Sequence, residues 1–209
     1  MSPAERPRND VTDDTAPAPH PAPPPTADTA PAERPGASDG AEGPIRPDWR
    51  FLAQHPAHWI ALGFGSGLAP RAPGTAGTLW AWMAWSLLGL GLTATQLGVL
   101  LALSLPVAWW ACTVTAAHMR TADPGAIVAD EIVAFWIILW LVLPAGFWGQ
   151  LIAFALFRFF DAVKPGPVGW ADRLFHSAHG WRGGFGIMLD DLVAAGCALL
   201  VIALWRVWW

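Results

Sequence analysis

The 209-residue chain has few charged side chains, and this shortage limits the functions that it can have. Only 13% of its residues are charged and 54% are hydrophobic, which is too apolar for an ordinary soluble domain of this length. Composition therefore predicts a membrane protein. The formal net charge is −4, and neither the first 50 residues nor the remainder has an excess of Lys and Arg over Asp and Glu. We therefore expect no nucleic-acid partner.

Cysteine is also scarce, and several catalytic motifs are missing. Cys112 and Cys197 lie far apart inside apolar runs and form no CxxC motif, so both are interpreted as small buried side chains. The glycine-rich stretch GSGLAPRAPGT lacks the GK[ST] of a P-loop, and the chain contains no GxSxG motif. The sequence therefore supports neither P-loop nucleotide binding nor serine hydrolysis.

The first 48 residues have almost no aliphatic side chains. Twelve of the 20 prolines lie here, among Ala, Asp and Thr, without the apolar core of a signal peptide. Such a segment cannot bury enough apolar surface to offset the entropy lost on ordering. Residues 1–48 are therefore predicted to be a disordered tail, and residues 49–209 a membrane-embedded helical domain.

Five apolar runs occupy that domain, at 79–92, 97–112, 132–143, 147–160 and 192–209. They predict an all-α, integral membrane bundle of about four to five helices, with Gly/Pro-rich loops at one face. Most runs are shorter than the ~20 residues that cross a bilayer, so some helices extend into their flanks or are only partly embedded. The uncharged breaks at 88–95 and 144–149 favour helical hairpins, although 132–157 is also compatible with one proline-kinked span.

All seven acidic residues beyond residue 50 lie in three short segments: DPGAIVADE (123–131), FRFFDAVKPGPVGWADR (157–173) and GGFGIMLDD (183–191). Two hairpins would bring these segments to one membrane face, whereas a single span over 132–157 would separate Asp130 from Asp161. Six Lys and Arg residues lie in or beside these segments and the Gly/Pro loop, and none lies in the opposite linkers. This bias predicts that the acidic face is cytoplasmic.

Each acidic segment has a structural and a functional interpretation. Asp123 before Pro124 is typical of a helix N-cap, which would place Asp123 and Asp130 two turns apart on one helical face. Arg158, Asp161 and Lys164 follow one another at three-residue spacing, which suits either a modest ion-pair ladder or a phosphate site. The adjacent aspartates 190 and 191 are expected in the first turn of the last helix, where the helix dipole favours acids and where a divalent cation would also offset them.

Taken together, the acids suggest chemistry on phosphate. Carboxylates without His or Cys ligands favour Mg²⁺ over Zn²⁺, and a metal with nearby Arg and Lys is typical of phosphoryl transfer or phosphate-ester hydrolysis. An ion-coupled transporter would also carry acids inside a membrane. We disfavour it because the acids lie at the ends of the apolar runs and no inverted repeat is visible.

Four motifs in order, GFGSGLAPRAPGTAGT, DPGAIVADEIVAFW, FRFFDAVKPGPV and GGFGIMLDDLVAA, resemble the phosphatidylglycerophosphatase A family over most of residues 60–200. The resemblance implies a Mg²⁺-dependent, multi-pass membrane phosphatase of phospholipid biosynthesis. Such an enzyme hydrolyses phosphatidylglycerophosphate to phosphatidylglycerol at the cytoplasmic face of the bacterial inner membrane. Another membrane lipid phosphate is the alternative substrate, and the oligomeric state is not predicted.

The resemblance also implies roles for individual residues. Asp130, Glu131, Asp190 and Asp191, with Asp123, would hold Mg²⁺. Arg158 and Lys164 would bind the phosphate and stabilise developing charge, and Asp161 is left open as a base or a nucleophile. The glycine-rich loop would contribute to the phosphate and substrate site through Gly74, Thr75 and Gly77.

Overall fold

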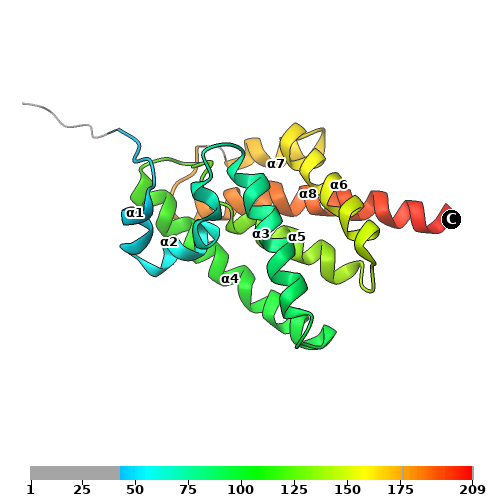
Figure 1. Ribbon diagram of the computed structural model, residues 1–209. Helices are drawn as coiled ribbons and strands as arrows, with labels where there is room; N and C mark the ends of the chain where they lie inside the picture. The colour runs from blue at the N-terminus through cyan, green and yellow to red at the C-terminus, as the bar shows by residue number, and fades with distance from the viewer. Residues whose placement is uncertain (1–42, 176, 209) are drawn as a thin grey trace, which may run out of the picture. The chain divides into compact units, whose positions relative to one another are not determined.

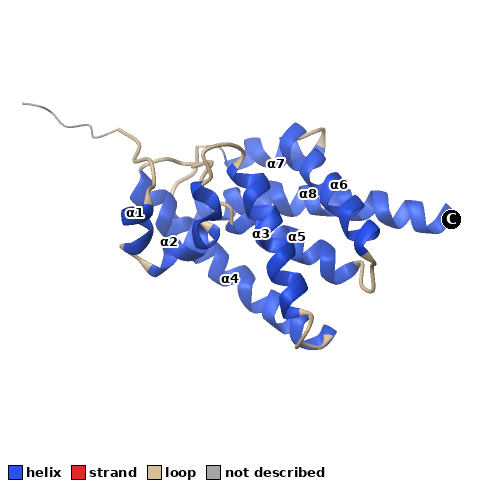
Figure 2. Ribbon diagram, viewed as in Figure 1, coloured by secondary structure: helices blue, strands red, loops and turns tan. Residues whose placement is uncertain are grey.

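The protein is helical throughout the part that the structure describes. The computed structural model describes residues 43–208 with the exception of His176, and no strand occurs within that part (Figures 1 and 2). The all-α prediction is confirmed for these residues. Most of the predicted disordered tail, residues 1–42, lies outside the described residues.

The helices follow one another without long intervening loops, and the bounds below are used throughout. In chain order they are α1 (Trp49–Ala53), α2 (Pro56–Ala61), the 3-10 helix η1 (Gly63–Leu68), α3 (Pro73–Leu88), α4 (Ala94–Met119), α5 (Ala129–Leu141), α6 (Phe147–Val163), α7 (Pro167–Phe175) and α8 (Gly180–Trp208).

Local sequence explains where several of these helices begin and end. The Asp48 side chain accepts the N–H of Phe51 and caps α1, and Thr93 caps α4 in a reciprocal pair with Gln96. Helix α6 ends at Val163, and its C-cap residue Lys164 adopts a left-handed backbone conformation (φ 48°) directly before a proline. The caps thus place Lys164 at the junction of α6 and α7.

Helix α5 lies at the centre of the bundle and packs against α3, α4 and α8 (Figure 1). It is mostly buried and carries large core side chains, among them Phe135, Ile138 and Leu139. Helix α3 can approach the start of α5 closely because it has a glycine there: a Cβ at Gly77 of α3 would lie only 2.6 Å from Val128, the residue before α5. The first turn of α5 is therefore surrounded by other helices.

Each uncharged break separates two helices, as predicted: the first lies between α3 and α4, and the second between α5 and α6. Helices α5 and α6 are separate, with a turn over residues 142–146, so the alternative of one kinked span is wrong. The start of α5 and the end of α6 meet at one end of the bundle, because Arg158 contacts both Glu131 and Asp161 there. The second hairpin thus brings two acidic segments together.

Among the described residues, two helices are long and apolar enough to cross a membrane, namely α4 and α8. The five predicted apolar runs fall largely in α3, α4, α5, α6 and α8, although the first run extends beyond Leu88 and the third beyond Leu141. The helices are therefore confirmed, whereas a membrane bundle of four to five helices stays a prediction. Helices α3, α5 and α6 are shorter, with 16, 13 and 17 residues. These lengths fall below the ~20 residues that a helix needs to cross the hydrocarbon core of a bilayer.

Two local predictions are wrong. Asp123 does not cap a helix, because residues 123–128 are a loop and α5 begins only at Ala129 after Val128. The last helix begins at Gly180 rather than near Asp190, because the glycines of GGFG are themselves helical. Asp190 and Asp191 consequently lie about three turns into α8, where the dipole of a helix end no longer favours acids. Helix α7 was not predicted.

Candidate active site

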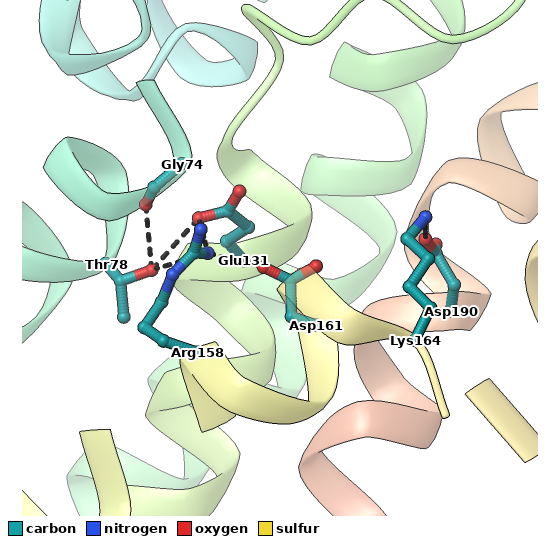
Figure 3. A network of polar contacts seen from close by, with 7 residues as sticks. All are labelled: Gly74, Thr78, Glu131, Arg158, Asp161, Lys164 and Asp190. Atoms are coloured by element: carbon teal, nitrogen blue, oxygen red, sulfur yellow. Dashed lines mark hydrogen bonds and ion pairs between the residues drawn. The ribbon is translucent and has the colours of Figure 1, made fainter. Parts of the chain in front are cut away.

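One polar network is centred on Arg158 near the C-terminal end of α6 (Figure 3). Its Nη1 donates to Oε2 of Glu131 at 2.7 Å and to Oδ2 of Asp161 at 2.5 Å. The buried hydroxyl of Thr78 lies 2.9 Å from the same Oε2 of Glu131 and 2.9 Å from the carbonyl oxygen of Gly74. Three helices, α3, α5 and α6, therefore converge on one guanidinium group.

A second network is centred on Lys164, which follows α6 directly. Its Nζ donates to Oδ1 of Asp172 on α7 at 2.5 Å and to Oδ2 of Asp190 on α8 at 2.6 Å. A small cleft beside this network is lined by Asp123, Asp172 and Asp190. Lys164 thus links α7 to α8 through two ion pairs, and Asp123 of the loop before α5 lines the cleft next to them.

Three buried aspartates complete the site. Asp130 and Asp190 are each 9% exposed and Asp191 is 3% exposed. Asp190 is paired with Lys164, but neither Asp130 nor Asp191 forms an ion pair with a described residue. The Oδ1 atom of Asp130 is buried without a hydrogen-bond partner among the described residues. Burying carboxylates in this way is costly unless a positive charge offsets them.

The electrostatics of α5 and Lys164 reflect this crowding of acids. Burial raises the pKa of Glu131 to about 7, although the charge of Arg158 opposes that rise. Burial also raises the pKa of Asp130 well above its usual range, and the neighbouring charges of Glu131 and Asp190 raise it further. For Lys164, burial alone would lower the pKa, but the hydrogen bonds with Asp172 and Asp190 outweigh it and raise the pKa.

The predicted glycine-rich loop lies partly in the first turns of α3. Gly74 is required by close approach, because a Cβ there would lie 2.0 Å from Oε1 of Glu131. Gly77 faces Val128 instead, and Thr75 is half-buried. In this structure Gly74 therefore borders the Arg158 network, whereas Gly77 permits the packing of α3 against the segment before α5.

Most of the predicted site residues gather at one end of the bundle, but they fall into distinct groups. Glu131 and Asp161 pair with Arg158, Asp190 pairs with Lys164, and Asp130 and Asp191 have no cationic partner among the described residues. Two participants were not predicted, Thr78 and Asp172. Thr78 is the last residue of GTAGT, and Asp172 lies in the second acidic segment. Both therefore belong to stretches that the sequence had singled out, but nothing in the sequence showed which residues they contact.

The donor chemistry of the site fits Mg²⁺. Carboxylate oxygens are the ligands that Mg²⁺ prefers, and the Oδ1 atom of Asp130 is an oxygen that no other described group uses. Among the described residues, no three His, Cys, Asp or Glu side chains form a ready-made metal site. The aspartates therefore fit the ion in donor type and burial, without forming a closed ligand cage.

An all-helical protein that sets Arg and Lys among buried carboxylates has the equipment of an enzyme that acts on phosphate esters. Comparison with known proteins agrees with this class. The profile of the family described as Phosphatidylglycerophosphatase A matches residues 59–206, and the chain belongs to this family. The protein is therefore a phosphatase, as its motifs predicted.

Three curated relatives are similar over most of their length. The proteins named Phosphatidylglycerophosphatase A from Escherichia coli and Haemophilus influenzae are 40% and 39% identical to the chain. These matches cover 69% and 74% of the chain, and 80% and 91% of the relatives. A Bacteroides thetaiotaomicron protein with the name "Putative phosphatidylinositol-3-phosphatase" is 38% identical over 70% of the chain and 91% of its own length. No solved structure matches the chain.

Proposed function

We propose that this phosphatase hydrolyses phosphatidylglycerophosphate to phosphatidylglycerol and inorganic phosphate, a step of phospholipid biosynthesis, and that it requires Mg²⁺. The family and the two relatives named for this activity support the substrate. The observation that carries the proposal is the meeting of Arg158 and Lys164 with the buried carboxylates of α5 and α8 at one end of the bundle.

Arg158 and Lys164 are assigned to the terminal phosphate of the lipid. A phosphate monoester carries up to two negative charges, and a guanidinium and an ammonium group supply charge-assisted hydrogen bonds to its oxygens. Both cations now contact carboxylates, so a bound phosphate would take the place of some of those contacts. Gly74 and Thr75 belong to the first turn of α3, whose backbone N–H groups are suited to an anion, and Gly77 follows one turn further on.

Asp130, Asp190 and Asp191 are assigned to Mg²⁺, with Glu131 and Asp123 at the edge of the same group. When bound, the ion would supply Lewis-acid activation and offset the charge of the phosphate and the acids. This assignment also explains why Asp130 and Asp191 are buried without a cationic partner among the described residues. Charge balance thus favours a cation between α5 and α8.

In the proposed reaction a water oxygen attacks phosphorus, and the bond from phosphorus to the lipid oxygen breaks. The leaving oxygen takes up one proton, which balances the proton that the attacking water loses, and becomes a hydroxyl of phosphatidylglycerol. Asp161 contacts Arg158 and would therefore lie beside the bound phosphate, where its carboxylate accepts the proton of the attacking water. Arg158 and Lys164 stabilise the negative charge that develops on the phosphoryl oxygens.

We further propose that the protein is a multi-pass protein of the bacterial inner membrane, with this site at the cytoplasmic face. The apolar helices α4 and α8 support insertion, and the relatives are bacterial. Arg71, Arg120 and Arg173 accompany the acidic segments, and such a bias towards positive charge is typical of cytoplasmic faces. A lipid phosphate lies at the depth at which a helix leaves the hydrocarbon, which suits a site at one end of the bundle.

The decisive variant is Asp191→Asn in the full-length protein. Phosphate release from phosphatidylglycerophosphate in detergent micelles should fall at least about a hundredfold. Loss of a group that only hydrogen-bonds to a metal ligand lowers activity by about 10- to 100-fold, and loss of a ligand itself should lower it further. The matched control is Asp48→Asn, which makes the same change at an exposed aspartate that caps α1. Near-normal turnover of Asp191→Asn, or turnover of the unaltered protein that persists after chelation of divalent cations, would contradict the assignment.

A second candidate substrate is the monoester of another membrane lipid. The relative named for a phosphatidylinositol phosphate favours this alternative. A panel of phosphatidylglycerophosphate, phosphatidic acid and phosphatidylinositol 3-phosphate, each assayed with and without Mg²⁺, separates the two. Preference for the first lipid by kcat/KM supports the main proposal, and preference for either of the others supports the alternative.

A further inference from the structure

A second cleft lies outside the acidic centre. It has a volume of about 720 Å³ and is bounded by residues 45–54, which include α1, and by the C-terminal end of α4. Neither of the cations assigned to catalysis lines it, and neither do the buried aspartates of α5 and α8. The cleft and the acidic centre are therefore separate.

Positive charge dominates the walls of this cleft. Among the described residues that line it, three are arginines, Arg46, Arg50 and Arg120, and one is an acid, Asp48. Asp48 is already engaged, because its Oδ1 accepts the N–H of Phe51 at 2.8 Å. None of the ion pairs between described residues involves Arg46 or Arg50. Two exposed guanidinium groups thus remain available to an anion.

A pair of histidines borders the cleft on the α4 side. Nδ1 of His58 lies 2.7 Å from the carbonyl oxygen of Phe51 and must carry a proton, because a carbonyl only accepts. Burial lowers the pKa of His58, and the Nε2 atom of its ring lies 2.8 Å from Nδ1 of His118. His118 lines the cleft with its Nδ1 engaged by His58, so the donors available to an anion are the guanidinium groups of Arg46 and Arg50.

The surroundings of the cleft favour a lipid as the source of the anion. Trp49 at the start of α1 is 65% exposed, and Trp59 of α2 and Phe64 of η1 are 40% and 55% exposed. Exposed aromatic side chains beside basic groups are typical of the membrane interface. The candidate span α4 ends at Met119, so Arg120 lies where a spanning helix would leave the hydrocarbon. The arginines would therefore lie at the depth of phospholipid headgroups.

We propose that this arginine cleft, lined by Arg46, Arg50, His118 and Arg120, is an accessory site that binds the phosphate of an anionic phospholipid through Arg46 and Arg50. The proposal rests on the membrane location proposed above, but not on the chemistry of the acidic centre. Guanidinium groups pair readily with phosphate oxygens, often through two hydrogen bonds each. Asp48 is the one carboxylate among the described residues of the lining, and it caps α1, so the cleft is equipped to bind the lipid rather than to hydrolyse it.

The test measures binding of a fluorescent phosphatidylserine to the full-length protein in nonionic detergent micelles. Phosphatidylserine is an anionic phosphodiester that is neither substrate nor product of the proposed reaction. The double variant Arg46→Gln/Arg50→Gln should bind it at least about tenfold more weakly, because two charge-assisted contacts are lost. The control Arg71→Gln/Arg182→Gln removes two exposed arginines outside the cleft and should bind within about twofold of the unaltered protein.

Five results decide the outcome. Competition by unlabelled phosphatidylserine but not by phosphatidylcholine supports the proposal, as does recovery of binding in Arg46→Lys/Arg50→Lys. Undiminished binding by the Gln double variant overturns the proposal, and so does equal competition by phosphatidylcholine. Displacement by millimolar inorganic phosphate would identify a site for free phosphate and overturn the lipid assignment. All three double variants should keep their phosphatase activity, so loss of lipid binding alone does not affect the proposed function.

Discussion

Gly74→Ala is the substitution for which the structure gives the sharpest expectation. A Cβ at this position would lie 2.0 Å from Oε1 and 2.8 Å from Cδ of Glu131. The obstructing group is the end of a flexible side chain, so Glu131 would move rather than the α3 backbone. That movement would break its contacts with Thr78 and Arg158. Function and stability should therefore both respond to a single methyl group.

The size of the effect follows from opposing contributions. Losing a hydrogen bond to a charged group costs about 1.5–3 kcal/mol, and the pair between Arg158 and Glu131 is mostly buried, with side chains 19% and 12% exposed. Alanine in place of glycine inside a helix contributes about 1 kcal/mol in the other direction. We expect a net loss of about 0.5–2 kcal/mol in the free energy of unfolding, measured by denaturant titration in micelles. Phosphate release should fall at least about tenfold, because Arg158 loses the carboxylate that orients it.

A double-mutant cycle tests the cause. In a Glu131→Ala background the space next to Gly74 is open, so adding Gly74→Ala should not destabilise the protein further. Gly196→Ala serves as the matched control, because nothing lies within 4 Å of a Cβ at that helical position, and it should keep full activity. An equal cost of Gly74→Ala in both backgrounds would refute the reasoning, since the cost would then not come from Glu131.

Two further predictions concern the charged groups of the site. Because burial raises the pKa of Glu131 from 4.5 to about 7, the folded state binds more protons than the unfolded state between these values. Stability should therefore decrease as the pH rises through this window, by at most about 1.4 kcal/mol per pH unit, and Glu131→Gln measured without divalent cations should lack this component. Lys164→Met should abolish activity and destabilise the fold by about 1–3 kcal/mol, because Asp190 would stay buried without its cation, whereas Asp172→Asn keeps that pair and should cost less. Equal unfolding midpoints for these two variants would show that the pair between Lys164 and Asp190 does not stabilise the fold more than the pair between Lys164 and Asp172.

Local chemistry accounts for what the sequence predicted correctly. Apolar runs separated by uncharged Gly/Pro breaks predicted separate helices, and α3 to α6 follow those breaks. The order and spacing of four motifs carried the resemblance to the family, which the comparison confirms. These features depend on residues that are neighbours along the chain, and so they can be read without knowledge of the fold.

Helix boundaries near the site were less predictable because tertiary packing overrides local preferences. Asp123 and Pro124 have the chemistry of a helix start, yet the chain remains a loop until α5. Gly183 and Gly184 disfavour a helix by themselves, but their lack of a side chain lets α8 pack closely, since a Cβ at Gly184 would lie 2.0 Å from Oγ1 of Thr113 on α4. Packing against α4 thus favours an early start of α8.

The sequence by itself determined the helical class, the family and the set of ionisable residues from which a phosphatase site can be built. Only the tertiary structure decided how these residues are paired. Arg158 lies between the acids of α5 and α6, Lys164 pairs with Asp190 of α8, and Asp130 is left with an unpartnered buried oxygen. The physical reason is that side-chain contacts between helices depend on how the helices pack, and residues 27 or 60 positions apart meet only after packing.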